Sequence, residues 1–220
     1  MKIRSQSELQ DALDQSFAAR KRELTTLRFM VLRCKREHEK QALLRAIVPM
    51  LYAHWEGFIR LAATAYLEYI SRRSGKAKDF QVNFLALTCR DKILKLGGSK
   101  KIVLHTELIE YILMQLDRPV DFNANDMIDT QSNLSSETLR EIMVAVGLPF
   151  DTYWQKKERI IDNMLLKVRN EIAHGHLAIV DETEFEQLYN LVLESLENFK
   201  SAIENAATLE TYRKPDTADE

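Results

Sequence analysis

The chain has 220 residues, of which 45% are apolar and 29% charged, and its formal net charge is -2. This composition supplies enough apolar side chains for one sizeable core, and it excludes a protein held to nucleic acid by a strongly positive overall charge. The two cysteines, Cys34 and Cys89, have no CxxC spacing, which excludes a disulfide framework and favours a reducing cytoplasm. Charged residues interrupt every long apolar run, so we expect no membrane-spanning segment.

Apolar residues recur at helical spacing along most of the chain, and Gly and Pro are scarce, with 6 and 4 copies. This pattern predicts an all-α helical bundle with long antiparallel helices and an irregular helical insertion in the middle. The predicted helices are, in chain order, residues 7–39, 41–73, 82–96, 104–116, 136–146, 154–174 and 184–209. We expect residues 1–210 to form a single helical domain with residues 76–135 as its internal insertion, and residues 211–220 to be a disordered tail.

Local signals mark the ends of these helices. Pro49 lies inside the second one, where it either bends the helix or marks a boundary. Residues 117–137, rich in Asp, Asn, Ser and Thr, predict an ordered connection rather than a helix. Thr183 with Glu186 has the spacing of a capping box that opens the last helix.

The second helix carries two polar residues in a stretch that otherwise builds core, "LYAHWEGFIRLAATAYLEYI". These residues are His54 and Glu56. A buried carboxylate is costly without a partner, so Glu56 predicts a cation or a hydrogen-bond donor facing it.

The stretch "KVRNEIAHGHL", residues 167–177, combines an Arg, an Asn and two His around a Gly. On a helix Asn170 and His174, four residues apart, share one face, while Arg169 is about 140° round from His174. Gly175 is the expected terminator, so His174 lies in the last turn, where exposed carbonyl groups favour imidazolium. Arg169 opposes that charge, so we expect a histidine that titrates near neutral pH.

Arg beside His, without metal-binding carboxylates, suits cleavage of RNA by its own 2′-OH. The histidine would take the proton of that hydroxyl, and the guanidinium would stabilise the charge on the transition state. No metal and no cofactor is needed. The departing 5′-oxygen needs a second proton, which a second copy of the motif across a two-fold axis would supply.

Simpler roles remain open for each of these residues. The alternative for His174 is a helix-end histidine bonded to a carbonyl, that for Arg169 is an ion pair with Glu171 or Glu56, and that for Asn170 is a cap or a core amide. Lys167 either binds phosphate or is a solvated surface residue. His174 and His176 together suggest a metal site, but two histidines without a third ligand are too few to bind zinc.

The motif "RNEIAHG" resembles the Arg, polar residue, His signature of the HEPN superfamily. Together with "AHWEGF" and "SNLSSETL", it is similar to the MAE-like branch of HEPN nucleases over nearly the whole chain. The resemblance implies a homodimeric, metal-independent endoribonuclease with Arg169, Asn170 and His174 as catalytic residues. It also implies that Glu56, or His54 in its place, supports the motif.

By the same resemblance, such proteins serve in prokaryotic phage defence or toxin–antitoxin systems, often under a neighbouring regulator or antitoxin protein. The alternative is a catalytically silent HEPN scaffold that binds a nucleotide or a partner protein.

Overall fold

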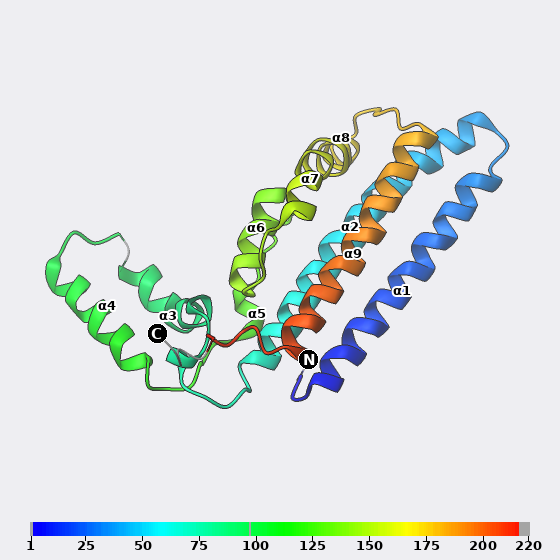
Figure 1. Cartoon of the computed structure of the whole chain (residues 1–220). Helices are drawn as coiled ribbons and strands as arrows, with labels where there is room; N and C mark the ends of the chain where they lie inside the picture. The colour runs from blue at the N-terminus through cyan, green and yellow to red at the C-terminus, as the bar shows by residue number, and fades with distance from the viewer. Residues whose placement is uncertain (1, 97, 216–220) are drawn as a thin grey trace.

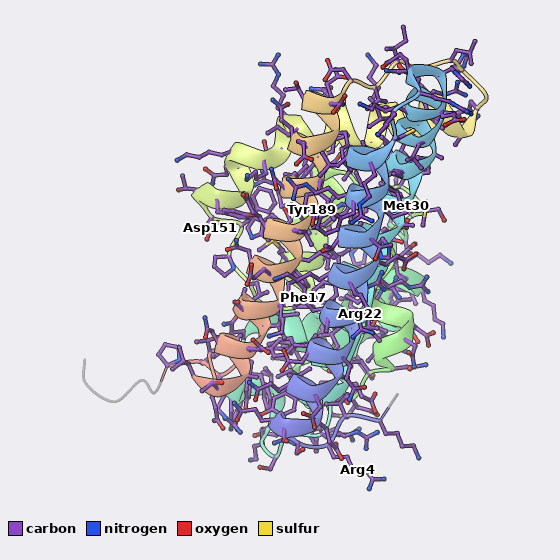
Figure 2. All side chains as sticks on the ribbon, turned by 90° about the vertical axis from the view of Figure 1, so that its right-hand side faces the viewer. Arg4, Phe17, Arg22, Met30, Asp151 and Tyr189 are labelled. Carbon is purple, nitrogen blue, oxygen red and sulfur yellow. The ribbon has the colours of Figure 1, made fainter. Side chains whose placement is uncertain are left out.

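The computed structural model of the chain describes residues 2–96 and 98–215. Its three longest helices are α1 (Gln6–Arg33), α2 (Glu37–Ile70) and α9 (Glu182–Thr208). They lie side by side, with α1 antiparallel to both α2 and α9 (Figure 1). Figure 2 shows α1 and α9 as neighbours from the side. The described residues form no β-strand, which confirms the predicted all-α bundle.

A second group of helices flanks α2 and α9 on the side away from α1 (Figure 1). It consists of α6 (Ser136–Ala145), α7 (Thr152–Ile160), a π-helical segment η2 (Ile161–Leu166) and α8 (Lys167–Ala173). Trp55 of α2 packs against Trp154 of α7 with ring centroids 6.1 Å apart, and Trp154 also meets Phe199 of α9. These buried rings join the two groups, since each large aromatic side chain removes much apolar area from water.

The middle of the chain forms an arm that projects from one end of the bundle (Figure 1). It contains a 3₁₀ turn (Ala77–Asp79) and the helices α3 (Val82–Leu96), α4 (Ile102–Gln115) and α5 (Ala124–Met127). Helix α4 packs against α3 but leaves a row of apolar side chains in solvent, namely Ile102, Val103, Ile109, Leu113 and Met114. The short α5 returns the chain to α2.

The first two helices differ from their predicted bounds. The predicted helix over 7–39 ends at Arg33, because Cys34 and Arg36 adopt extended backbone and α2 already begins at Glu37. Pro49 neither ends nor divides α2. Charge and apolar spacing continue through the break, so periodicity alone did not reveal it.

Two predictions near the C-terminus are wrong. The capping box of α9 consists of Asp181 and Glu184 rather than Thr183 and Glu186, so the helix begins two residues earlier than expected. The predicted disorder from residue 211 fails at Tyr212, which is 1% exposed and stacks on Phe80. The backbone N–H of Gln81 also donates to the Tyr212 carbonyl. Residues 216–220 of the predicted tail lie outside the described residues.

Candidate functional site

The helical stretch that carries the motif changes its winding just before the motif begins. Six residues of η2 separate α7 from α8. Asp162 within η2 accepts hydrogen bonds from the backbone N–H and the hydroxyl of Ser136, at 2.8 and 2.5 Å. It thereby satisfies donors at the N-terminus of α6, where the helix dipole favours a negative charge. This contact ties the start of α6, and the loop before it, to the motif helix.

The motif helix ends as the sequence predicts. His174 is the C-cap residue and Gly175 follows with a φ of +81°. The N–H of Gly175 donates to the carbonyl of Ile172, and that of His176 donates to Glu171. These two bonds form a Schellman motif, which needs a left-handed residue after the C-cap. The His174 side chain is exposed and contacts no hydrogen-bond partner among the described residues.

Arg169 is held in place by the loop before α6. Its Nη2 donates to the carbonyl oxygen of Ser132 at 3.1 Å and lies 3.3 Å from Oδ1 of Asn133. Its guanidinium carbon lies 3.8 Å from the centroid of the Tyr52 ring, a cation–π contact. Among the described residues no hydrogen bond involves Nη1, and Nε is buried without a partner, so the protein uses only one of the three guanidinium nitrogens.

Tyr52 fixes that loop as well as the arginine. The backbone N–H of Leu134 donates to the Tyr52 hydroxyl at 2.6 Å, in a buried position. Burial raises the pKa of this hydroxyl, so the neutral phenol is the form present at neutral pH. Gln131 and Ser132 both have left-handed backbone, with φ of 54° and 53°, which turns the Ser132 carbonyl toward Arg169. Left-handed conformations are costly for residues other than Gly, so the surrounding contacts must maintain them.

Asn170 joins the same loop. Its Nδ2 donates to Oδ1 of Asn133 at 3.4 Å, so Asn133 accepts from two neighbouring residues of the motif. The structure therefore brings Arg169 and Asn170 together on Asn133. His174 and Lys167 are exposed on the same helix and reach neither that loop nor one another through a hydrogen bond.

Glu56 takes a different partner from the one expected. It accepts a hydrogen bond of 2.5 Å from the Thr130 hydroxyl, and within the described residues no ion pair joins it to Arg169. The expected donor is present, but it comes from the loop before α6. Glu56 and Arg169 are thus connected through that loop, at Thr130 and Ser132, rather than directly.

His54 faces away from the motif. It lies against α1, where its Nδ1 is 3.3 Å from Nη1 of Arg20 and its Nε2 is 3.4 Å from the Glu23 carboxylate. Burial lowers the pKa of the imidazole, Arg20 lowers it further, and Glu23 opposes both. The neutral imidazole therefore accepts from Arg20, and His54 serves the α1–α2 contact instead of supporting Arg169.

This placement makes stability depend on pH. Because the pKa of His54 is below its ordinary value of 6.5, the unfolded chain binds the proton first as pH falls. The contribution of neutral His54 to folding stability is complete above pH 6.5 and is lost as the pH falls toward the pKa of His54 in the folded protein. We expect the thermal midpoint to decrease as the pH is lowered from about 7.5 to about 5.5, and we expect His54→Gln to make that decrease smaller. The exposed His38, changed to Gln, is the matched control and should leave the decrease unchanged.

The sequence did not reveal Tyr52, Ser132 or Asn133 as parts of the site. Tyr52 lies four residues before Glu56 on one face of α2, and "SNLSS" is a run of residues that favour tight turns. The position of Tyr52 and the turn-forming run were both visible in the sequence. Neither predicts which helix the turn packs against.

A family model described as MAE_28990-like HEPN matches residues 9–212 of the chain. The chain belongs to this HEPN family. No curated protein and no solved structure matches it. HEPN domains are of nuclease type or bind nucleotides, and they are generally RNase-like. They often dimerise and bind RNA. Within residues 2–96 and 98–215 of this HEPN protein, no helix is long and apolar enough to cross a membrane.

Proposed function

We propose that this HEPN protein is a metal-independent endoribonuclease, with Arg169, Asn170 and His174 as its catalytic residues. The observation that carries the proposal is that Arg169 of α8 is held in a fixed position while His174, at the end of the same helix, is exposed. Arg169 is immobilised by Tyr52 and Asn133, whereas His174, five residues later, is free at the helix end. The two residues are about 7.5 Å apart along the helix axis and about 140° apart around it.

The chemistry needs one base, one acid and one cation. His174 takes the proton of the 2′-OH, whose oxygen forms a bond to phosphorus as the bond from phosphorus to the 5′-oxygen breaks. A protonated His174 of a second copy gives its proton to that 5′-oxygen. The products are a 2′,3′-cyclic phosphate and a 5′-hydroxyl. Nη1 of Arg169 binds the charge that develops on the phosphoryl oxygens, Asn170 orients the substrate, and Lys167 contacts a neighbouring phosphate.

Exposed apolar residues beside the motif support the homodimer. Leu177 and Ile179, just after His174, are 79% and 83% exposed. The end of α1, on the other side of α2 and α9, carries a separate exposed set, Phe29, Met30 and Leu32, each at least half exposed. Met30 stands at the upper end of α1 in Figure 2. A second copy that covers Leu177 and Ile179 would bring two motifs together.

Membership of the family is the support for a proposal on the cellular role. We propose that the enzyme acts on cytoplasmic RNA in a prokaryotic defence or toxin system, under an antitoxin or regulator protein. The exposed row on α4 favours a partner protein as well, and it is also the observation that speaks for the alternative, a catalytically silent HEPN scaffold. Cleavage activity distinguishes the two.

A direct assay tests the proposal. Purified protein in EDTA should cut single-stranded RNA, and the 5′ fragments should end in a 2′,3′-cyclic phosphate, visible by mass spectrometry. Light scattering at micromolar concentration should give the mass of a dimer. RNA left intact at every protein concentration, together with tight binding of a nucleotide, would favour the scaffold instead.

A further inference from the structure

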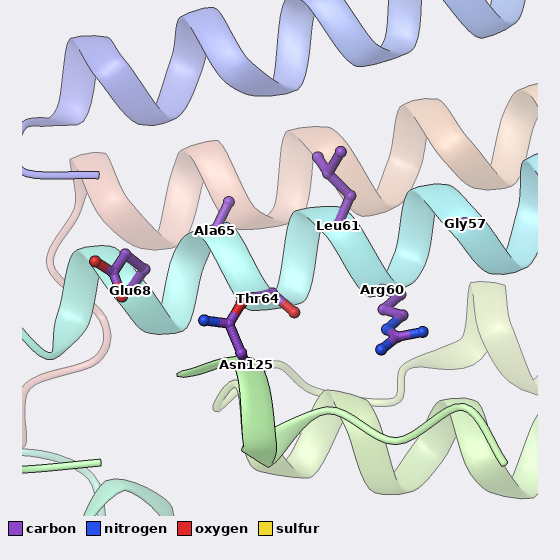
Figure 3. A pocket seen from close by; sticks show the side chains of 7 residues that line it. All are labelled: Gly57, Arg60, Leu61, Thr64, Ala65, Glu68 and Asn125. Atoms are coloured by element: carbon purple, nitrogen blue, oxygen red, sulfur yellow. The ribbon is translucent and has the colours of Figure 1, made fainter. Parts of the chain in front are cut away.

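A groove of about 310 Å³ runs along α2 beside α5. Figure 3 shows the side chains that line it. The lining residues are Gly57, Arg60, Leu61, Thr64, Ala65, Glu68 and Asn125. Leu61 and Ala65 are its apolar lining residues, and Arg60 stands at one end of the groove, while the carboxylate near the other end, Glu68, pairs with Arg72.

Arg60 has no ion-pair partner in residues 2–96 and 98–215. Glu56, one helical turn before it, is the natural partner for an arginine at this spacing. That carboxylate is instead bonded to Thr130. The guanidinium of Arg60 is exposed and free to bind an anion.

A second guanidinium, from α1, lies against Gly57, one of the residues that line the groove. Arg20 lies over Gly57, where a Cβ would be 3.1 Å from its Nη2. Its Nε donates to Ser16 and its Nη1 meets His54, but its Nη2 makes no hydrogen bond to the described residues. Burial lowers the pKa of Arg20, with Glu23 opposing, so the charge lacks full compensation. A glycine within a helix lowers its stability, and here it makes room for this arginine.

The groove lies on the same helix as the tyrosine beneath Arg169. The segment from α5 to the loop before α6 runs antiparallel to α2. Asn125 lines the groove with Thr64, Thr130 bonds Glu56, and Leu134 bonds the Tyr52 hydroxyl beneath Arg169. Arg60 follows Tyr52 by eight residues, or about 12 Å along the helix. Arg60 and Arg169 are therefore close enough for neighbouring parts of one RNA strand.

We propose that this groove is a subsite for the single-stranded RNA substrate, with Arg60 and Arg20 binding a backbone phosphate and the partly exposed Leu61 contacting a base. The proposal rests on the proposed function, since the substrate is RNA. Phosphate binding by guanidinium groups together with apolar contact to bases is the usual way that proteins bind single strands without reading their sequence. The chain thereby acquires local positive charge despite its net charge of -2.

Binding of a fluorescent single-stranded RNA of mixed sequence to the His174→Ala protein tests the subsite without cleavage. Arg60→Gln should weaken binding about tenfold, as expected for loss of a charged hydrogen bond. It should also reduce the slope of log affinity against log salt by about 0.7. The matched control is Arg22→Gln, an exposed arginine on the outer face of α1 (Figure 2), which should change neither quantity. In the otherwise wild-type enzyme, Arg60→Gln should raise KM and leave kcat unchanged.

A second variant displaces the Arg20 guanidinium as a whole. Gly57→Ala places a Cβ 3.1 Å from Nη2 and 3.2 Å from Nη1, so the guanidinium must shift and RNA binding should weaken, while the preference of alanine for the helix offsets part of any lost stability. Equal affinities for Arg60→Gln and Arg22→Gln would overturn the subsite, as would a His174→Ala protein that binds no RNA. A wild-type protein that cuts no RNA, but whose RNA affinity falls with Arg60→Gln, would contradict the nuclease and retain the groove.

Discussion

Replacing His174 with alanine is expected to lower the turnover of RNA cleavage by about a thousandfold or more, because one histidine would serve as base in one copy and as acid in the other. Loss of both proton transfers leaves only the electrostatic contribution of Arg169. The fold should not change, because the side chain is exposed and caps the helix through its backbone alone. Single-turnover cleavage at saturating protein, with EDTA present, measures the effect.

His176→Ala is the matched control for that measurement. His176 is also exposed, lies two residues further on, and contributes only its backbone N–H to the helix end. Its replacement should leave turnover within about twofold, since a surface change of this kind has little effect on the fold. Equal activity of the His174→Ala protein and the wild type would exclude His174 from the chemistry. Equal losses from both replacements would point to the shape of the turn at Gly175 instead.

The helices and the end of the motif could be predicted because they depend on residues close in sequence. Gly175 terminates α8 through bonds to residues within the preceding turn, as its position indicated. The family resemblance in the sequence agrees with the match over residues 9–212. Local competition explains the one wrong cap, because Asp181 and Thr183 each have a Glu three residues later and the spacing does not choose between them.

The surroundings of Arg169 could not be predicted because they depend on contacts across the fold. Asn133 is 36 residues from Arg169 in sequence, and Tyr52 is 82 residues from Leu134. The sequence offered Glu171 or Glu56 as a partner for the arginine, and the family resemblance favoured Glu56. In the structure a loop with two left-handed residues lies between them and satisfies each separately. Glu56 and Arg169 each have a polar partner, as expected, but these partners are loop residues rather than one another.

Tyr52→Phe is expected to lower the free energy of unfolding by about 1–3 kcal/mol, because the buried N–H of Leu134 loses its acceptor while the ring beneath Arg169 remains. The loosened loop should also hold Ser132 and Asn133 less firmly against Arg169, so kcat should fall about tenfold with little change in KM. Urea unfolding gives the first quantity, provided that its slope does not change, and RNA cleavage gives the second.

Tyr212→Phe separates this effect from the loss of any buried hydroxyl. The Tyr212 side chain is as well buried as that of Tyr52, but its hydroxyl has no hydrogen-bond partner in the described part of the chain. Its removal should therefore leave stability unchanged or raise it slightly, because an unpaired polar group is costly in the core. Activity should not change either, as Tyr212 packs on Phe80, away from the motif. If Tyr52→Phe kept full kcat despite the lost stability, the loop would be a structural support alone, and Arg169 would owe its position to the Tyr52 ring.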